Sequence, residues 1–186
     1  MGFQPSLVAR GAPNEPDSVT FRNAMRHLAG GVSVITVGQG ENRTGLTATS
    51  FSALSTEPPR VIFCVNRQSS SYSEIAKAGQ FGVNILAAHQ EEIAGRFSGR
   101  GGIKGADRYV GGAWKVLSSG VSILTDALAG FDCEVEEVIE RHSHAIIIGK
   151  VRAIHAPGGP GALLYWRGGF DQLGWTVDQA EKAVGL

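Results

Sequence analysis

The chain has little cysteine and little net charge. Its two cysteines in 186 residues, Cys64 and Cys133, stand 69 positions apart in apolar segments. This spacing favours two buried thiols over a disulfide framework, a CxxC metal pair or cysteine redox chemistry. The 17 basic and 17 acidic residues cancel, and no lysine or arginine run is long enough to follow a row of phosphates. We therefore expect no nucleic-acid partner.

Long apolar stretches are also missing. The longest, at residues 32–37 and 145–148, are far shorter than the roughly 20 residues that a membrane helix needs. The first sixteen residues lack the basic start and apolar core that are typical of a secretory signal. We expect a soluble, cytoplasmic protein with no membrane partner.

Several familiar site motifs are absent as well. The chain has no GxGxxG that opens a helix after a strand, and no GxxxxGK[ST], HExxH or GxSxG. The pair His142 and His144 has no third ligand nearby in sequence, so we expect no metal site. These absences argue against conventional nucleotide-binding, zinc-hydrolase and serine-hydrolase chemistry.

Glycine, in contrast, is abundant, with 26 residues, about twice its usual share. The glycines separate alternating segments, as turns between short strands require. Apolar periodicity predicts a helix that begins at Asp17 or Ser18 and stops at Gly30, and further helices at residues 71–77, 89–97 and 177–184. The expected strands are residues 32–37, 44–54, 60–66, 80–86, 131–139, 145–154 and 163–170.

This pattern predicts a mainly β protein with short helices (α+β). About seven mostly antiparallel strands favour a closed or nearly closed barrel with helical inserts. We expect a tight bend at His142 and Ser143, and a mobile glycine-rich loop at residues 99–112. The domain is expected to span residues 17–173, between a flexible arm at 1–16 and a helical tail at 174–186.

Two segments carry candidate chemistry. Residues 66–72 leave a strand and enter a helix with three serines and Arg67, a junction suited to a phosphate; alternatively, one serine only caps the helix. Residues 44–51 form a strand of small and hydroxylated side chains, against which a flat, polar-edged ring can lie. The alternative is an ordinary threonine-rich core strand.

A longer ordered pattern runs through residues 18–173. Together these motifs resemble the short-chain flavin reductase family, the reductase components of two-component flavin monooxygenases. The residues that carry the resemblance are Phe21-Arg22, Gly31-Val32-x-Val34-Ile35-Thr36, residues 45–51, Glu57-Pro58-Pro59, Ser70-Ser71, Gly79-x-Phe81-x-Val83-Asn84-x-Leu86, Gln90, Arg96-Phe97, Cys133-x-Val135, His144, Gly149-x-Val151 and residues 163–168.

The resemblance implies an antiparallel split β-barrel, a homodimer and an NAD(P)H:flavin oxidoreductase. Such an enzyme reduces FMN or FAD with NADH or NADPH and supplies a separate flavin-dependent monooxygenase. The hydride passes between cofactors, so the protein has only to position them. A non-catalytic flavin- or haem-binding carrier or sensor is the alternative, and a purely structural dimer is a third.

The resemblance also implies particular site residues. The flavin ring would lie against Thr44, Gly45, Leu46, Thr47, Thr49 and Ser50, with Val65 and Asn66 beneath the ribityl chain and Ser70, Ser71, Arg96 and Phe97 near the phosphate; Arg67 is a lesser candidate. The nicotinamide would contact His144, Trp166, Arg167 and Phe170.

Two positions depart from the family pattern. His142-Ser143-His144 stands where the family has Gly-Asp-His, and Phe170 stands where it usually has a tyrosine. We expect His144 to position the nicotinamide and not to act as an obligatory proton donor, because the N5 proton can come from solvent.

Overall fold

The computed structural model describes residues 15–174. The expected helix at 177–184 and most of the expected arm and tail therefore lie outside the described residues. The helices are α1 (Ser18–Met25), α2 (Ser70–Ala78) and α3 (Glu91–Phe97), with the 3-10 turns η1 (Gly40–Asn42), η2 (Arg100–Gly102) and η3 (Gly105–Tyr109). The strands are β1 (Gly30–Gly31), β2 (Ser33–Val37), β3 (Thr44–Ala48), β4 (Ser52–Thr56), β5 (Pro59–Asn66), β6 (Gln80–Ile85), β7 (Trp114–Val116), β8 (Ser122–Leu124), β9 (Ala129–Arg141), β10 (His144–His155), β11 (Ala162–Trp166) and β12 (Gly169–Leu173).

The main sheet has seven antiparallel strands in the order β3-β2-β6-β9-β10-β5-β4. Strands β3 and β4 lie at its two edges, yet only residues 49–51 separate them in the chain. The sheet must therefore curl until its edges approach each other, because three residues span at most about 11 Å. This confirms the mainly β, antiparallel fold with short helices. Within residues 15–174, no ladder pairs β3 with β4.

Two expected strands were wrong in extent. The segment 44–54 is not one strand, because the chain leaves the sheet after Ala48 and re-enters at the other edge from Ser52. The segment 163–170 is instead a hairpin, β11–β12, with a turn at Arg167 and Gly168, whose φ values are +50° and +90°. Local composition hid the first break, because hydroxylated and aromatic residues continue through residues 49–51. The second break did have a local signal, because Gly168-Gly169 is a turn dipeptide. The short β7–β8 pair was not expected.

The glycine-rich loop at residues 99–112, expected to be mobile, is folded. It forms η2 and η3, and it buries Arg108 and Tyr109. The Tyr109 ring packs edge-on against Phe97, with ring centroids 5.0 Å apart, and lies 4.8 Å from Trp114. Glycine content signals backbone freedom, whereas the buried Tyr109 ring attaches this loop to the core.

Two apolar clusters form the core. One lies inside the curled sheet and includes Phe63, Phe81 and Ile147, while the other lies between the sheet and α3 and includes Phe97 and Leu163. Both α2 and α3 turn apolar side chains toward the sheet. No helix in the described part of the chain is long and apolar enough to cross a membrane.

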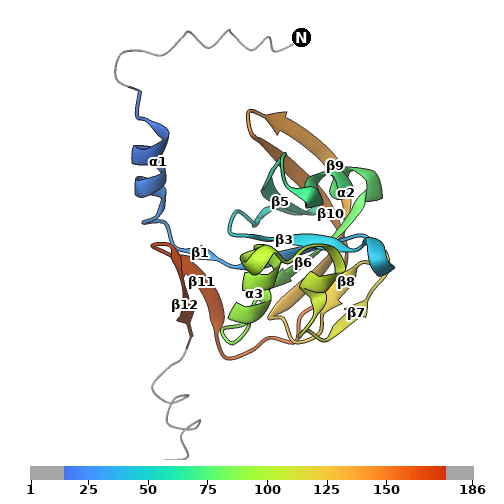
Figure 1. Cartoon of the computed structure of the whole chain (residues 1–186). Coiled ribbons are helices and arrows are strands. Elements are labelled where there is room, and N and C mark those ends of the chain that lie inside the picture. The colour runs from blue at the N-terminus through green and yellow to red at the C-terminus, as the bar shows by residue number, and fades with distance from the viewer. Residues whose placement is uncertain (1–14, 175–186) are drawn as a thin grey trace, which may run out of the picture.

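Helix α1 is different, because none of its residues is buried. The Asp17 carboxylate caps its start, accepting the Val19 and Thr20 N–H groups at 2.8 Å. Figure 1 shows α1 standing away from the main sheet, joined to it through β1 and the β11–β12 hairpin. Its apolar side chains Val19, Phe21 and Met25 are exposed.

Candidate functional site

The start of α2 is tied to the end of β5. Asn66 Oδ1 accepts the Gln68 N–H at 2.9 Å, and the Ser69 hydroxyl oxygen accepts the Ser71 N–H at 3.3 Å as the helix cap. Ser70, in the first turn, is exposed. The helix ends at Gly79, which adopts φ +65°. Short helices that begin this way present free N–H groups and the positive end of the dipole to solvent.

Ser71 has a different environment from Ser70. Its side chain is fully buried, donates to the Gly45 carbonyl oxygen at 2.6 Å and lies 3.3 Å from the Thr44 hydroxyl. The expected phosphate and ring segments therefore meet, but through buried side chains that join α2 to β3.

Arg108 and Tyr109 reinforce this junction, and sequence reasoning missed both. The Arg108 guanidinium donates to the Gly45 carbonyl and lies 3.5 Å from the Ser71 hydroxyl, while the Tyr109 hydroxyl donates to the Thr44 carbonyl at 2.6 Å. Burial lowers the pKa of Arg108 and raises that of Tyr109. The only available signal was an arginine and an aromatic residue inside a glycine-rich loop.

Two more arginines surround η3. Arg96 donates to the Asp107 carbonyl at 2.6 Å, and Arg43 lies over the Tyr109 ring at 4.5 Å. The Nε atoms of both are buried and have no hydrogen-bond partner among residues 15–174. In that same part of the chain, no carboxylate pairs with Arg43, Arg96 or Arg108. This region therefore carries positive charge and unused donors suited to an anion.

Three side chains at the β5–β10 ladder share one exposed face. Asn66 is paired with His144, so their side chains point the same way, and Cys64 lies two residues before Asn66 on that face. The Ser50 hydroxyl bonds the backbone of Cys64, donating to its carbonyl at 3.2 Å and accepting its N–H at 3.0 Å. We call Ser50, Cys64, Asn66 and His144 the β5 face. Val65 points to the opposite side and is buried in the core.

A groove lies between β3, α3 and the β11–β12 hairpin, and Thr49, next to Ser50 in the chain, lines both of its cavities. One cavity of about 410 Å³ is lined by Thr47, Thr49, Glu91, Ser98, Arg100, Tyr165, Gly168, Gly169 and Phe170. A second, of about 260 Å³, shares Thr49, Tyr165 and Gly168 with it and extends to Arg22, Met25, Arg26, Leu28, Gly30, Trp166 and Arg167. His144 is not among the lining residues of either cavity.

The remaining expected residues are held by hydrogen bonds, a cation–π contact or packing in the core. The Thr47 hydroxyl donates to the Ala94 carbonyl at 2.6 Å, which ties β3 to α3. Trp166 Nε1 donates to the His27 carbonyl at 3.3 Å, and the Arg167 guanidinium lies 4.4 Å from the Trp166 ring centre. Leu46 is half-buried against the sheet core, and Phe97 is buried beneath Tyr109 and Trp114.

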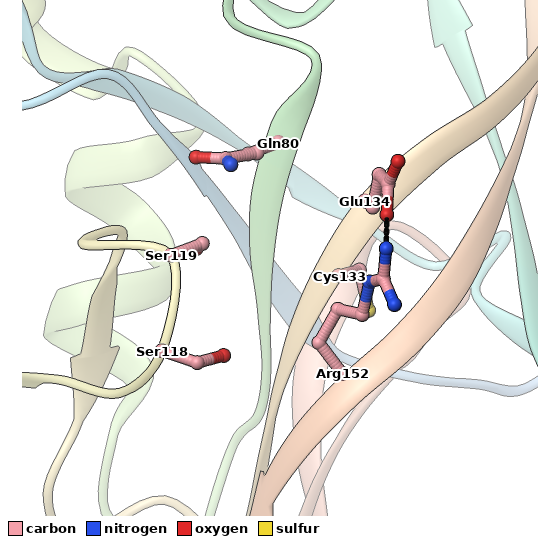
Figure 2. Close-up of a pocket in the computed structure, with 6 residues that line it drawn as sticks. All are labelled: Gln80, Ser118, Ser119, Cys133, Glu134 and Arg152. Atoms are coloured by element: carbon pink, nitrogen blue, oxygen red, sulfur yellow. Dashed lines mark hydrogen bonds and ion pairs between the residues drawn. The ribbon is translucent and has the colours of Figure 1, made fainter.

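A separate cavity of about 490 Å³ lies on another part of the sheet. Figure 2 shows its six lining residues: Gln80, Ser118, Ser119, Cys133, Glu134 and Arg152. Arg152 and Glu134 form an ion pair there, and burial raises the pKa of the Cys133 thiol to about 12. A thiol with such a pKa is almost entirely protonated near neutral pH and is a poor nucleophile. None of the expected site residues lies in this cavity.

Comparisons with known proteins show which sequences and folds this chain resembles. The family model described as flavin reductase like domain matches residues 25–174. FMN reductase (NADH) RutF of Agrobacterium fabrum is 34% identical over 152 residues, which cover 82% of this chain and 86% of that protein.

Two solved structures are similar over most of the chain. Nitrilotriacetate monooxygenase component B from Mycobacterium thermoresistibile has a TM-score of 0.76 at 33% identity, covering 83% of this chain and 86% of that one. The NADH:FAD oxidoreductase SgcE6 of Streptomyces globisporus, in complex with NAD and FAD fragments, has a TM-score of 0.78 at 27% identity, covering 87% and 96%. Because the family model spans most of its length, this chain belongs to the flavin reductase like domain family.

Proposed function

We propose that this protein is an NAD(P)H-dependent flavin reductase, which transfers hydride from a nicotinamide to FMN or FAD and supplies the reduced flavin to a separate monooxygenase. The family match supports the activity, and relatives named as an FMN reductase and as a monooxygenase component support the two roles. One structural observation carries the proposal. The exposed β5 face lies directly before the start of α2, so a flat surface of small side chains adjoins a phosphate-suited helix start.

The residues present fit a flavin. A planar ring needs an exposed surface without bulky side chains, and Thr49, Ser50, Cys64 and Asn66 provide one. The phosphate needs donors and positive charge, which the Ser70 hydroxyl and the first turn of α2 supply. On α3, Arg96 adds a guanidinium whose Nε has no hydrogen-bond partner among residues 15–174.

Within the proposed flavin set, exposure divides direct contacts from support. Thr49, Ser50, Asn66 and Ser70 are exposed and face the flavin in this proposal. Buried or half-buried members act by shaping the backbone beneath it; these are Thr44, Gly45, Leu46, Thr47, Val65, Ser71 and Phe97. Ser71 thus holds β3 against α2 and leaves the phosphate to Ser70 and to backbone N–H groups.

A bound flavin supplies the hydride-accepting chemistry, so the chain needs no nucleophile or strong base. The residues described here bind and orient the two rings and exclude water between them. His144 is exposed on the β5 face, and its Nδ1 lies 2.9 Å from the Ser143 hydroxyl, which restrains the imidazole. We assign it to positioning the nicotinamide.

The groove beside the β5 face is the proposed path of the nicotinamide dinucleotide. Phe170 offers an aromatic wall in one of its cavities, and Trp166 and Arg167 line the other. Its other cations are Arg22, Arg26 and Arg100, against a single acidic residue, Glu91. In residues 15–174 none of these four arginines is in an ion pair. A cationic groove of this kind suits the pyrophosphate of a dinucleotide.

We further propose a homodimer that works in the cytoplasm. The support for the dimer is α1, which buries no residue and exposes Val19, Phe21, Met25 and Leu28 in and just beyond the helix. An unpartnered apolar surface of this kind is typical of an interaction site. A cytoplasmic location gives a nicotinamide-dependent reductase access to the cell's reduced nicotinamide pool.

The direct test is NADH oxidation by the purified chain, followed at the nicotinamide absorbance band with and without flavin. We expect oxidation to require added FMN or FAD, and a parallel series with NADPH identifies the preferred donor. Unchanged absorbance with both flavins and both nicotinamides would refute the proposed enzymatic activity. Flavin binding without oxidation would favour the carrier alternative, which the altered turn at His142, with φ +50°, prompts.

A further inference from the structure

We propose that Arg67 is a positioning residue, which fixes the turn that carries His144 against the start of α2. This inference rests on the proposed function, in which His144 contacts the nicotinamide and the start of α2 binds the flavin phosphate. Arg67 would then set the position of one cofactor relative to the other without touching either reacting ring.

Arg67 holds the β9–β10 turn through three contacts. Its backbone N–H donates to the Ser143 carbonyl at 3.0 Å, and Nη1 donates to the His142 carbonyl at 3.2 Å. Its Nη2 atom pairs with Glu140 Oε2 at 2.7 Å, on the strand that leads into the turn. Both carbonyls of the two-residue turn are therefore bound by one residue at the end of β5.

The same network reaches α2. Glu140 Oε1 accepts the Tyr72 hydroxyl at 2.5 Å, and this hydrogen bond raises the pKa of the tyrosine. Tyr72 is in the first turns of α2, directly after Ser70 and Ser71. Arg67, Glu140 and Tyr72 thus connect β5, the turn and the phosphate-suited helix start in one chain of hydrogen bonds.

The turn needs such restraint. His142 adopts φ +50°, a left-handed conformation that is unfavourable for a residue with a Cβ. The turn also contacts the imidazole of His144 directly, because the Ser143 hydroxyl lies 2.9 Å from His144 Nδ1. A shift of the two turn carbonyls would therefore move His144, and small displacements of positioning groups lower rates strongly.

The variants Arg67→Met and Arg67→Lys test this role. Arg67→Met keeps the backbone contact and the apolar stem but removes the two guanidinium contacts. We expect its KM for NADH, measured with saturating FMN, to rise on the order of tenfold, the factor that about 1.4 kcal/mol produces. Its Kd for FMN, from flavin fluorescence, should stay within about twofold. Arg67→Lys, which can keep the pair with Glu140, should recover part of the loss.

A matched control lies on the β9–β10 hairpin, which also carries Glu140. Arg152 pairs with Glu134 beside the cavity of Figure 2, and the exposure of that pair, 46% and 45%, matches the 43% and 47% of Arg67 and Glu140. Arg152→Met should leave both constants unchanged. Equal effects in the two variants would show that losing any surface ion pair on this hairpin suffices, and would overturn the proposal.

Other outcomes also decide against it. An unchanged KM for NADH in Arg67→Met would refute the positioning role. If Arg67→Met weakened the binding of FMN but not of riboflavin, Arg67 would be a phosphate ligand instead.

The His144 imidazole resonances in an NMR spectrum, assigned by comparison with His144→Gln, provide a readout that does not require turnover. They should shift in Arg67→Met but not in Arg152→Met, and no shift would refute the proposal. Failure of the wild-type chain to oxidise NADH would count against the proposed function alone. Glu140→Gln, which preserves shape, repeats the test should Arg67→Met not fold.

Discussion

The two cysteines occupy opposite environments, and this makes one of them a probe of the site. Cys133 is fully buried in the sheet core, and burial raises the pKa of its thiol to about 12. Cys64, which the sequence predicted to be buried, is instead exposed on the β5 face, because its side chain points away from the sheet core. The thiolate is the reactive form, so reactivity near neutral pH should be confined to Cys64.

We predict that one equivalent of iodoacetamide modifies Cys64 and leaves Cys133 intact, as measured by peptide mass spectrometry. Saturating FMN should slow the modification by about tenfold or more, the effect of covering the thiol in most of the molecules. Cys64→Ala should abolish labelling. An unchanged rate with FMN bound would place the flavin away from β5.

The arginines around η3 were the residues least visible in the sequence. The expected phosphate side named Arg96, and the structure adds Arg43 and Arg108 around η3. Their assembly depends on contacts between residues far apart in the chain, such as Arg108 and Ser71, 37 positions apart, and Tyr109 and Thr44, 65 positions apart. No periodic pattern encodes such a distance.

At the scale of single elements, α2 shows how neighbouring serines acquire different roles. A helix start exposes some side chains and turns others inward, and here Ser70 faces solvent while Ser71 faces Gly45 of β3. The sequence correctly predicted a helix start in this serine-rich segment. It could not separate the two serines, because the inward direction depends on where β3 packs.

Separate alanine variants should therefore split binding from stability. Ser70→Ala should weaken FMN binding by about 1–3 kcal/mol, the contribution of a charge-assisted hydrogen bond, and leave riboflavin binding unchanged. Ser71→Ala should instead lower the free energy of unfolding by about 1–3 kcal/mol, because it leaves buried polar groups unpaired. Fluorescence titration and urea unfolding measure the two effects, and exposed Ser73→Ala serves as the control. The reverse split would contradict the assignment.

The β3–β4 segment shows the limit of strand prediction. Its hydroxyl-rich run suggested one strand against which a ring could lie, and the strand does exist at residues 44–48. The chain then crosses to the other edge of the sheet, which places Thr49 in the groove and Ser50 on the backbone of Cys64. Curvature of the whole sheet, and not local propensity, determines that crossing.

At the scale of the whole molecule, the exposure of the apolar side chains of α1 is not explained by a single copy of the chain. Phe21, Met25 and Leu28, spaced four and three positions apart, form the apolar stripe that predicted the helix. Phe21 is nevertheless 59% exposed, and Leu28, just beyond α1, is 65% exposed. An amphipathic helix gains most of its stability from packing its apolar face. The proposed second copy would supply that packing.

We predict that Phe21→Asp shifts the chain from a dimer toward the 19.6 kDa monomer in sedimentation velocity. The physical reason is that a charge buried in an apolar interface is strongly unfavourable. Asn23→Asp, on the same exposed helix, introduces the same charge outside the apolar stripe and should leave the dimer intact. A monomeric wild-type chain, or identical behaviour of the two variants, would refute the α1 interface.

The sequence by itself determined the strand-rich class, most strand and helix starts, the His142–Ser143 bend and the family pattern, because these depend on periodicity, capping and turn residues close in the chain. Only the tertiary structure decided which side chains share the β5 face, that residues 99–112 fold around Tyr109, and that Arg67 holds the His144 turn. Those features arise from the register between distant strands and from burial. Both depend on how the whole sheet curls, and no local stretch of residues contains that information.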